Sequence, residues 1–192
     1  MEKQDIQRKL FHYLWKLCED KALCDQLIEI PTFAEIECGT CILEAGARTS
    51  YIGLIISGLI RGFYIDDAGN DITKCFSVEG DWCCSYNYLS KAPSPFYIET
   101  LEDTVLAKFD IEKTNRLLEK YPAMQDKVVQ LISQMFLESE RRILSFTSME
   151  AKDRYLSLSK ERPELIKRVK QEQLASYIGV TPSSLSRLKK YL

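Results

Sequence analysis

The stretch of residues 171–190, near the C-terminus, constrains the fold most, because it predicts two short helices joined by a tight turn. Leu174, Ala175 and Ile178 recur at helical spacing, which places them on one face of the first helix. Gly179 follows, and glycine readily adopts the left-handed conformation that commonly ends a helix. The small side chain of Ala175 and the glycine let a second helix cross closely, as in a helix-turn-helix.

The dipeptide Thr181-Pro182 is typical of the start of the second helix, since threonine caps free backbone N–H groups and proline suits the first position. Leu185 and Leu188 give this helix a narrow apolar stripe. In a DNA-binding helix-turn-helix the second helix enters the major groove. The alternative is an ordinary surface pair of helices with a basic end. The expected DNA contacts are Thr181, Ser183, Ser184, Ser186 and Arg187, with Lys189 and Lys190 nearer the phosphates.

Charge is distributed unevenly along the chain. Residues 151–192 contain ten Lys or Arg and four Asp or Glu, a net charge of +6, whereas the whole chain carries −2. The remaining residues therefore sum to −8. A basic segment on an acidic body is typical of a protein that binds a polyanion, although a solvated basic face has the same composition.

Composition indicates an ordinary globular chain, with 45% hydrophobic and 28% charged residues. No run approaches the roughly 18 consecutive apolar residues of a membrane span. The N-terminus lacks the apolar core of a signal peptide. We therefore expect a cytoplasmic protein with no membrane partner.

The seven cysteines are odd in number, so a disulfide framework is not expected. Cys38 and Cys41 have a CxxC spacing that could ligate zinc or an iron–sulfur cluster. The stretch reads as a strand, however, in which residues three apart point to opposite faces. No second CxxC exists, and His12 is the only histidine. We expect no metal or other cofactor and interpret most cysteines as small buried hydrophobes.

The first 110 residues predict helices followed by strands. Residues 3–30 have helical spacing and predict one or two amphipathic helices that end at Pro31. Short apolar runs then recur every 8–12 residues, with a hairpin turn at Asp66–Gly69, and favour an antiparallel sandwich or barrel. The expected strands include residues 41–43, 51–56, 59–65, 72–76, 96–100 and 105–109.

Residues 111–145 predict helices again. Asp110 is placed to cap a short helix and Pro122 to open a longer one. Two apolar stripes run along the longer helix, so we expect one against the β-module and the other against the same helix of a second chain. A single helix buried in its own domain is the alternative. The stripe expected at the dimer comprises Met124, Val128, Leu131 and Met135; beside it lie Val129, Ile132 and Phe136. A helix over 149–160 and a connector past Pro163 precede the helix-turn-helix.

This order of β-module, long helix and basic helix-turn-helix resembles the CRP/FNR family of bacterial regulators over nearly the whole chain. Glu37–Gly46 resembles the family's opening strand and glycine turn, and Tyr51–Tyr64 the strand pair that follows. Phe76–Trp82 resembles the segment that opens the phosphate-binding cassette. Arg187 is similar to the recognition-helix arginine that reads a guanine.

The resemblance implies an α+β fold in three parts. A double-stranded β-helix, or jelly roll like that of cyclic nucleotide-binding domains, with flanking helices would span residues 1–120. A dimerisation helix would span 121–146 and a winged-type helix-turn-helix 147–192. It also implies transcription regulation by a homodimer on an inverted-repeat operator in double-stranded DNA, with RNA polymerase as a further partner.

The sequence departs from the family where cyclic nucleotides bind. The binders carry a Glu after the cassette glycine and an Arg that pairs with the cyclic phosphate. Here Asp81 follows Gly80, and the Arg position falls on Pro93 or Ser94. Without a guanidinium a buried phosphate would lack its bidentate partner, so we do not expect cyclic AMP as effector. A pocket for an unknown small-molecule effector, or a filled core, is expected around Gly80, Asp81, Trp82, Ser85, Tyr86, Ser94 and Phe96.

Catalysis is not expected. Cupin-type metal enzymes of similar architecture need several histidine ligands, and neither a Gly-rich phosphate loop nor a Ser/His/Asp set occurs in the sequence. The remaining alternative to a DNA-binding regulator is a ligand-sensing module whose C-terminus binds protein.

Overall fold

A computed structural model describes residues 2–190. The chain divides into two compact units, residues 1–62 with 76–131 and residues 63–75 with 132–192. No helix of the described part is long and apolar enough to span a membrane. The helices are α1 (Lys3–Cys18), α2 (Lys21–Leu27), α3 (Tyr86–Ser90), α4 (Ile111–Leu118), α5 (Ala123–Ser148), α6 (Ala151–Glu161), α7 (Pro163–Arg168), α8 (Gln171–Ile178) and α9 (Pro182–Lys190). The strands are β1 (Thr32–Ile36), β2 (Cys41–Leu43), β3 (Tyr51–Ser57), β4 (Ile60–Ile65), β5 (Asp71–Ser77), β6 (Trp82–Cys83), β7 (Tyr97–Thr100) and β8 (Thr104–Asp110).

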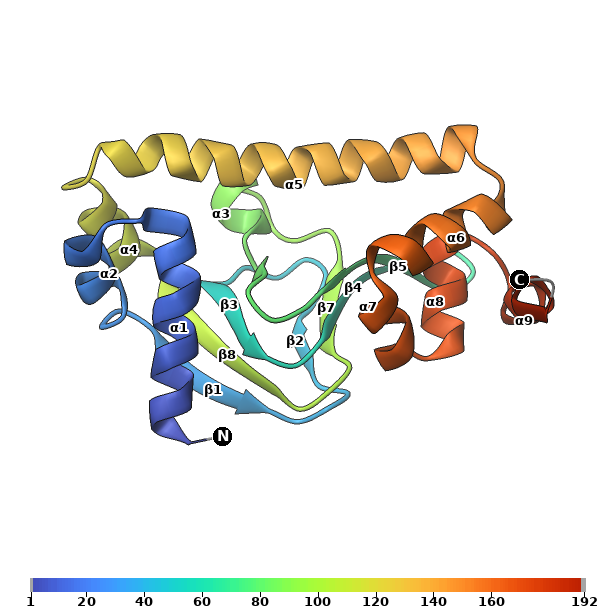
Figure 1. Ribbon diagram of the computed structural model, residues 1–192, viewed down its shortest axis with the longest axis horizontal. Coiled ribbons are helices and arrows are strands. Elements are labelled where there is room, and N and C mark those ends of the chain that lie inside the picture. The colour runs from blue at the N-terminus through green and yellow to red at the C-terminus, as the bar shows by residue number, and fades with distance from the viewer. Residues whose placement is uncertain (1, 191–192) are drawn as a thin grey trace. The chain divides into compact units, whose positions relative to one another are not determined.

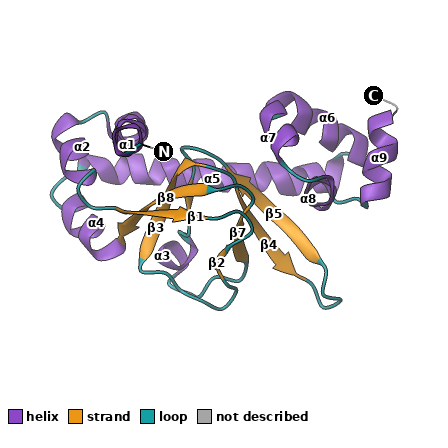
Figure 2. Ribbon diagram, turned by 90° about the horizontal axis from the view of Figure 1, so that it is seen from below, coloured by secondary structure: helices purple, strands orange, loops and turns teal. Residues whose placement is uncertain are grey.

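The strands form two four-stranded sheets, in the orders β1-β8-β3-β6 and β2-β7-β4-β5 (Figure 1). Strand β8 runs antiparallel to β1 and to β3, with Ala34 opposite Leu106 and Gly53 opposite Lys108. Helices α1, α2 and α4 gather at one end of these strands (Figure 2). The antiparallel jelly roll expected from the sequence is therefore confirmed.

Strand β3 is apolar on both faces because it separates two cores. Leu54 and Ile56 point to a cluster that includes Leu10 and Leu14 of α1. Ile55, between them, points to a second cluster between the sheets. Since strand residues alternate in direction, a continuous apolar run is what a strand covered on both sides requires.

A hairpin turn and a helix cap form as the sequence predicts. The Asp66 carboxylate accepts hydrogen bonds from the N–H groups of Ala68 and Asn70, which closes the hairpin between β4 and β5. These hydrogen bonds, first of all that from the Asn70 side chain, lower the pKa of Asp66. The Asp110 carboxylate accepts from the Lys113 N–H at 2.8 Å and caps α4.

The C-terminal part of the chain is helical. Pro163 opens the six-residue helix α7, where the sequence predicted a connector, because proline at the first helical position has no N–H to leave unsatisfied. The described residues from 149 to 190 form helices and turns only. The strands of the expected wing are therefore not among them, while the expected helix-turn-helix is.

Candidate nucleic-acid interface

Helices α8 and α9 form the predicted helix-turn-helix. Gly179 ends α8 with φ +75°, in the left-handed region. The Val180 N–H then donates to the Ala175 carbonyl at 3.0 Å, which satisfies a free carbonyl of the last turn. Ala175 and Leu185 are fully buried, one from each helix, so the two helices share a core at their crossing. This arrangement fixes the direction in which α9 projects.

Thr181 caps α9, as predicted. Its hydroxyl oxygen accepts from the Ser184 N–H at 3.2 Å and lies 3.0 Å from the Ser183 hydroxyl. The Ser184 hydroxyl oxygen in turn accepts from the Arg187 guanidinium at 3.3 Å. The cap and the arginine are thus linked by one chain of hydrogen bonds along the first turn and a half of the helix.

The residues proposed to contact DNA divide between two sides of α9. Ser183, Arg187 and Lys190 are exposed and recur at i, i+4 and i+7, on one face with the half-buried Ser186. Lys189 instead lies 5.9 Å from the centre of the Tyr155 ring of α6. Arg187 is therefore on the outward face of α9 with three polar neighbours, whereas Lys189 lies on the side of α9 that is near α6.

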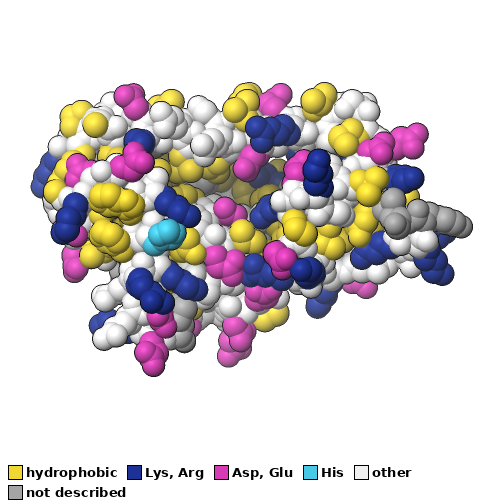
Figure 3. Space-filling view, in the orientation of Figure 1, with side chains coloured by type: hydrophobic (Ala, Val, Ile, Leu, Met, Phe, Trp, Pro, Cys, Tyr) yellow, Lys and Arg dark blue, Asp and Glu magenta, His cyan; other side chains and the backbone are white. Residues whose placement is uncertain are grey.

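The basic charge of residues 151–190 is not all available to a ligand. Figure 3 shows Lys and Arg side chains over α6–α9. Arg154, however, donates to the carbonyls of Ile178 and Met149 and lies over the Phe146 ring. It therefore joins α5, α6 and α8 rather than extending the outward basic face.

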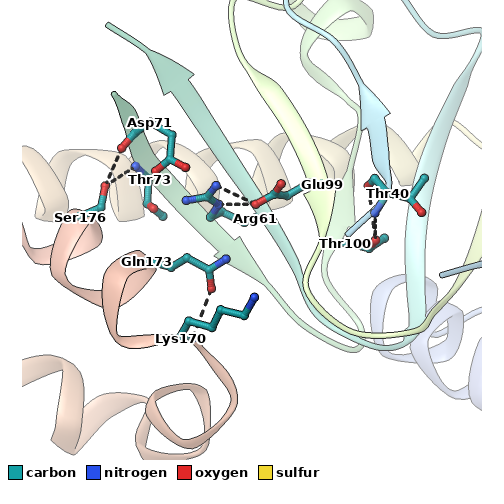
Figure 4. A network of polar contacts seen from close by, with 9 residues as sticks. All are labelled: Thr40, Arg61, Asp71, Thr73, Glu99, Thr100, Lys170, Gln173 and Ser176. Atoms are coloured by element: carbon teal, nitrogen blue, oxygen red, sulfur yellow. Dashed lines mark hydrogen bonds and ion pairs between the residues drawn. The ribbon is translucent and has the colours of Figure 1, made fainter. Parts of the chain in front are cut away.

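The hairpin that ends in β5 packs against α8 through Ser176. The Ser176 hydroxyl accepts from the Thr73 N–H at 2.9 Å and donates to the Asp71 carbonyl at 3.2 Å (Figure 4). Because β5 is the last strand of its sheet, these bonds occupy backbone groups that the sheet leaves unpaired.

A second contact reinforces the hairpin. The Arg142 guanidinium of α5 donates to the Thr73 carbonyl at 2.9 Å and lies 4.0 Å from the centre of the Tyr177 ring. Burial lowers the pKa of Arg142. Sequence reasoning missed both Arg142 and Ser176, because neither stands out from the charged and polar residues of an amphipathic helix.

The two stripes of α5 have different environments. Met124 lies in the core of the first unit, so it is not available to a second chain, and Val128, Leu131 and Met135 are half-buried. The neighbouring stripe faces solvent and continues further along the helix than expected. Its solvent-facing members are Val129, Ile132, Phe136 and Ile143, of which Phe136 is the most exposed at 61%. Phe146, further along the same stripe, packs on the guanidinium groups of Arg142 and Arg154.

The residues proposed to line an effector pocket are not all brought together. Gly80 and Asp81 form the turn before β6, where the Asp81 carboxylate accepts from the Val78 N–H at 2.9 Å. Trp82 packs on Phe109, with ring centres 5.3 Å apart, in the core that faces α1. These three residues therefore have structural roles in the turn and in that first core.

The other four pocket residues lie at or near the second core. Tyr86 meets Phe96 edge-on, with ring centres 5.6 Å apart, and Ser85 precedes the short helix α3. Ser94, one candidate for the position of the family's phosphate-binding arginine, is 1% exposed, and its hydroxyl donates to the Phe96 carbonyl. Its polar group is thus already satisfied within the loop.

The CxxC pair does not form a ligand set. The Cys38 thiol donates to the Leu101 carbonyl at 3.0 Å, and the Cys41 thiol donates to the Leu43 carbonyl at 3.4 Å. Among the residues that the structure describes, no group of three or more His, Cys, Asp or Glu is arranged to hold a metal ion. Cys18, Cys24, Cys83 and Cys84 are buried, as expected for small hydrophobes.

Comparison with known proteins defines the class to which this fold belongs. Residues 33–121 match the model of the cyclic nucleotide-binding domain. The global regulator CLP of Xanthomonas campestris, described as c-di-GMP-responsive, has a similar structure, with a TM-score of 0.73 at 15% identity over 90% of this chain and 91% of that one. The protein is thus a cyclic nucleotide-binding-type β-roll joined to a helix-turn-helix.

Two curated relatives extend the comparison. The chain is 22% identical to the anaerobic regulatory protein of Haemophilus influenzae, over 77% of this chain and 61% of that protein. It is also 22% identical to the fumarate and nitrate reduction regulatory protein of Salmonella typhi, over 80% of this chain and 65% of that protein. The chain therefore spans about three fifths of the length of these relatives. The chain is thus similar to regulators of the CRP/FNR type, with the cyclic nucleotide-binding domain matched over residues 33–121.

Proposed function

We propose that the protein is a transcription regulator that binds double-stranded DNA through α9 and acts without catalysis, in the cytoplasm. The observation that carries the proposal is the outward face of α9, on which Arg187 is exposed beside Ser183 and Lys190. An arginine so placed forms a bidentate contact with a guanine edge in the major groove, worth about 1–3 kcal/mol of discrimination between bases.

We further propose a homodimer whose seam is the exposed stripe of α5. Val129, Ile132, Phe136 and Ile143 follow the 3-4 spacing of a two-stranded coiled coil, with Ser139 at the one polar seam position. The seam proposed here thus differs from the sequence-based choice of Met124 and its stripe. A two-fold dimer presents two α9 helices to half-sites about 34 Å apart, so the operator is an inverted repeat.

A small-molecule effector and RNA polymerase are further proposed partners, and their only support is the resemblance to the CRP/FNR family. The buried Ser94 offers no guanidinium for a cyclic phosphate, which argues against cyclic AMP. The space between Tyr86 and Phe96 is occupied by their edge-on contact, which supports a filled core over an open pocket.

The test is DNA selection followed by substitution of Arg187. The purified chain is used to select duplexes from a random pool, and the recovered site is expected to be an inverted repeat. Arg187→Ala is expected to weaken the selected site by about 1–3 kcal/mol and to relax preference at one base pair in each half-site.

Lys167→Ala is the matched control, because Lys167 is a basic residue of α7 that is paired with Glu164 at 2.8 Å. It is expected to leave base preference unchanged. If Arg187→Ala and Lys167→Ala reduce binding equally at every sequence, α9 does not read bases and the proposal fails. A chain that binds a protein partner but no duplex would support the sensing-module alternative instead.

A further inference from the structure

Two adjacent cysteines, Cys83 and Cys84, lie inside the β-roll and take no part in the proposed DNA interface. They are 6% and 2% exposed. Neighbouring residues of an extended strand point to opposite faces, yet both cysteines belong to the same apolar cluster. Cys84 has a φ of +57°, in the left-handed region that residues with a side chain rarely adopt. This backbone conformation lets both side chains enter the same cluster.

The Cys84 sulfur is in a polar setting within this cluster. Cys83 and the half-buried Tyr51 belong to the same cluster as Cys84. The Lys108 ammonium lies 4.9 Å above the Tyr51 ring. The hydrogen bond from Cys83, followed by that from Tyr51 and the charge of Lys108, lowers the pKa of Cys84 in spite of burial. Since the thiolate is the reactive form, this sulfur is suited to bind an electrophile.

Strand β3 leaves room for the pair. Gly53 lies opposite Cys83 in the sheet, and a Cβ atom at Gly53 would meet the Cys83 sulfur at 2.6 Å and a Leu106 methyl at 2.9 Å. The glycine is therefore required for the Cys83 thiol to lie over the strand beside Cys84.

The other cysteine pairs differ from this one. Burial, followed by the neighbouring Cys24 thiol, raises the pKa of Cys18 to about 12, and burial also raises the pKa of Cys24. Cys38 and Cys41 donate to separate carbonyls, as described above. The thiolate form is therefore disfavoured at Cys18 and Cys24, whereas the thiols of Cys38 and Cys41 are directed to different acceptors.

We propose that Cys83 and Cys84 form a dithiol site that chelates a trivalent arsenical. Adjacent Cα atoms are about 3.8 Å apart, whereas disulfides usually span about 4.4–6.8 Å. A direct sulfur–sulfur bond is thus strained, and an atom that bridges the two sulfurs relieves that strain. With phenylarsine oxide two As–S bonds form, the As–O bond breaks, and the oxygen leaves with both thiol protons as one water. Arsenic stays trivalent, so no oxidant or reductant is needed.

Because the two sulfurs are buried, a small reagent reaches them only through a local opening, and the nearest short element is the five-residue helix α3, which begins two residues after Cys84. The experiment uses the full reduced chain, titrated with phenylarsine oxide and followed by intact mass under non-denaturing conditions. One phenylarsenic per chain is expected. Alkylation and peptide mapping are expected to show Cys83 and Cys84 as the two protected thiols of the seven. Excess ethanedithiol should release the arsenical, whereas a monothiol should not.

Protection of Cys38 with Cys41 or of Cys18 with Cys24, an absence of binding, or a chain lighter by two hydrogens with a Cys83–Cys84 disulfide would each overturn the proposal. Substitutions sharpen the test. Cys83→Ala leaves one thiol and is expected to lower affinity about 10²–10⁴-fold, because the second bond is lost. Cys38→Ala, the matched control, should bind as the unaltered chain does.

Gly53→Ala retains both thiols but displaces the Cys83 sulfur, and it should also weaken binding. If Cys83→Ala and Cys38→Ala bind phenylarsine oxide equally well, the proposed site is wrong. If Cys83→Ala does not fold, the thiol mapping of the unaltered chain decides the question.

Discussion

Replacement of Gly179 by alanine tests how the helix-turn-helix is held together. Gly179 has φ +75°, and an added Cβ would lie 2.5 Å from the Phe146 ring. The left-handed backbone costs an alanine about 1–2 kcal/mol. The ring must also shift from its contacts with the guanidinium groups of Arg142 and Arg154, at 4.9 and 4.8 Å. Each such contact is worth about 0.5–1 kcal/mol, so the total expected loss of stability is about 2–4 kcal/mol.

A matched glycine separates the backbone cost from the packing cost. Gly69, in the hairpin that belongs to the same unit, has φ +82° and no atom within 4 Å of an added Cβ. Gly69→Ala is therefore expected to lower stability by about 1–2 kcal/mol, the backbone cost alone. Urea unfolding followed by circular dichroism measures both changes as shifts in midpoint at constant slope.

A double substitution completes the test. In a Phe146→Ala background the ring is absent, so the cost of Gly179→Ala is expected to fall to that of Gly69→Ala. If the two glycine substitutions cost the same in the unaltered chain, or if removal of the ring changes nothing, the close approach of Phe146 to the turn is not what holds α8 and α9.

Three further predictions concern other parts of the molecule. Arg61→Met removes the counter-charge that Arg61 supplies to Glu99, its partner at 2.7 Å in the β-roll. Urea unfolding is expected to show a loss of about 3–5 kcal/mol in the free energy of unfolding. Most of that loss should be recovered in the double variant Arg61→Met/Glu99→Leu. Asp66→Asn is expected to destabilise the hairpin at neutral pH. Because hydrogen bonds depress the pKa of Asp66 in the folded state, the stability that its carboxylate contributes is lost as pH falls through that pKa. The unfolding curves of Asp66→Asn and of the unaltered chain should then converge. Phe136→Glu is expected to convert the dimer to monomer in sedimentation, whereas the same change at Gln134, an exposed residue on the opposite side of the helix, should not. If neither substitution dissociates the dimer, α5 is not the seam.

Local signals in the sequence predicted the turns and helix ends well. Gly179, Thr181 and Asp110 each act through backbone groups within four residues, so their effect does not depend on the rest of the fold. The alternation of apolar residues likewise predicted most of the β-roll strands, because both sheets bury the same periodic pattern.

Contacts between distant segments were beyond sequence reasoning. The two stripes of α5 are equally apolar, and only the fold shows that Met124 faces the core while Phe136 is exposed. Trp82 was grouped with Phe96 by proximity in the chain, yet the two face different cores. The hydrogen bonds from the β5 hairpin to Ser176 join residues more than a hundred positions apart.

The central claim is that a symmetric pair of chains places two α9 helices into one duplex. Sedimentation of the purified chain with a fluorescent duplex carrying the selected site measures this directly. Two chains per duplex are expected, with affinity that falls steeply as salt rises, because the Lys and Arg contacts to phosphate release counterions. One chain per duplex, or no binding at any salt concentration, would contradict the account.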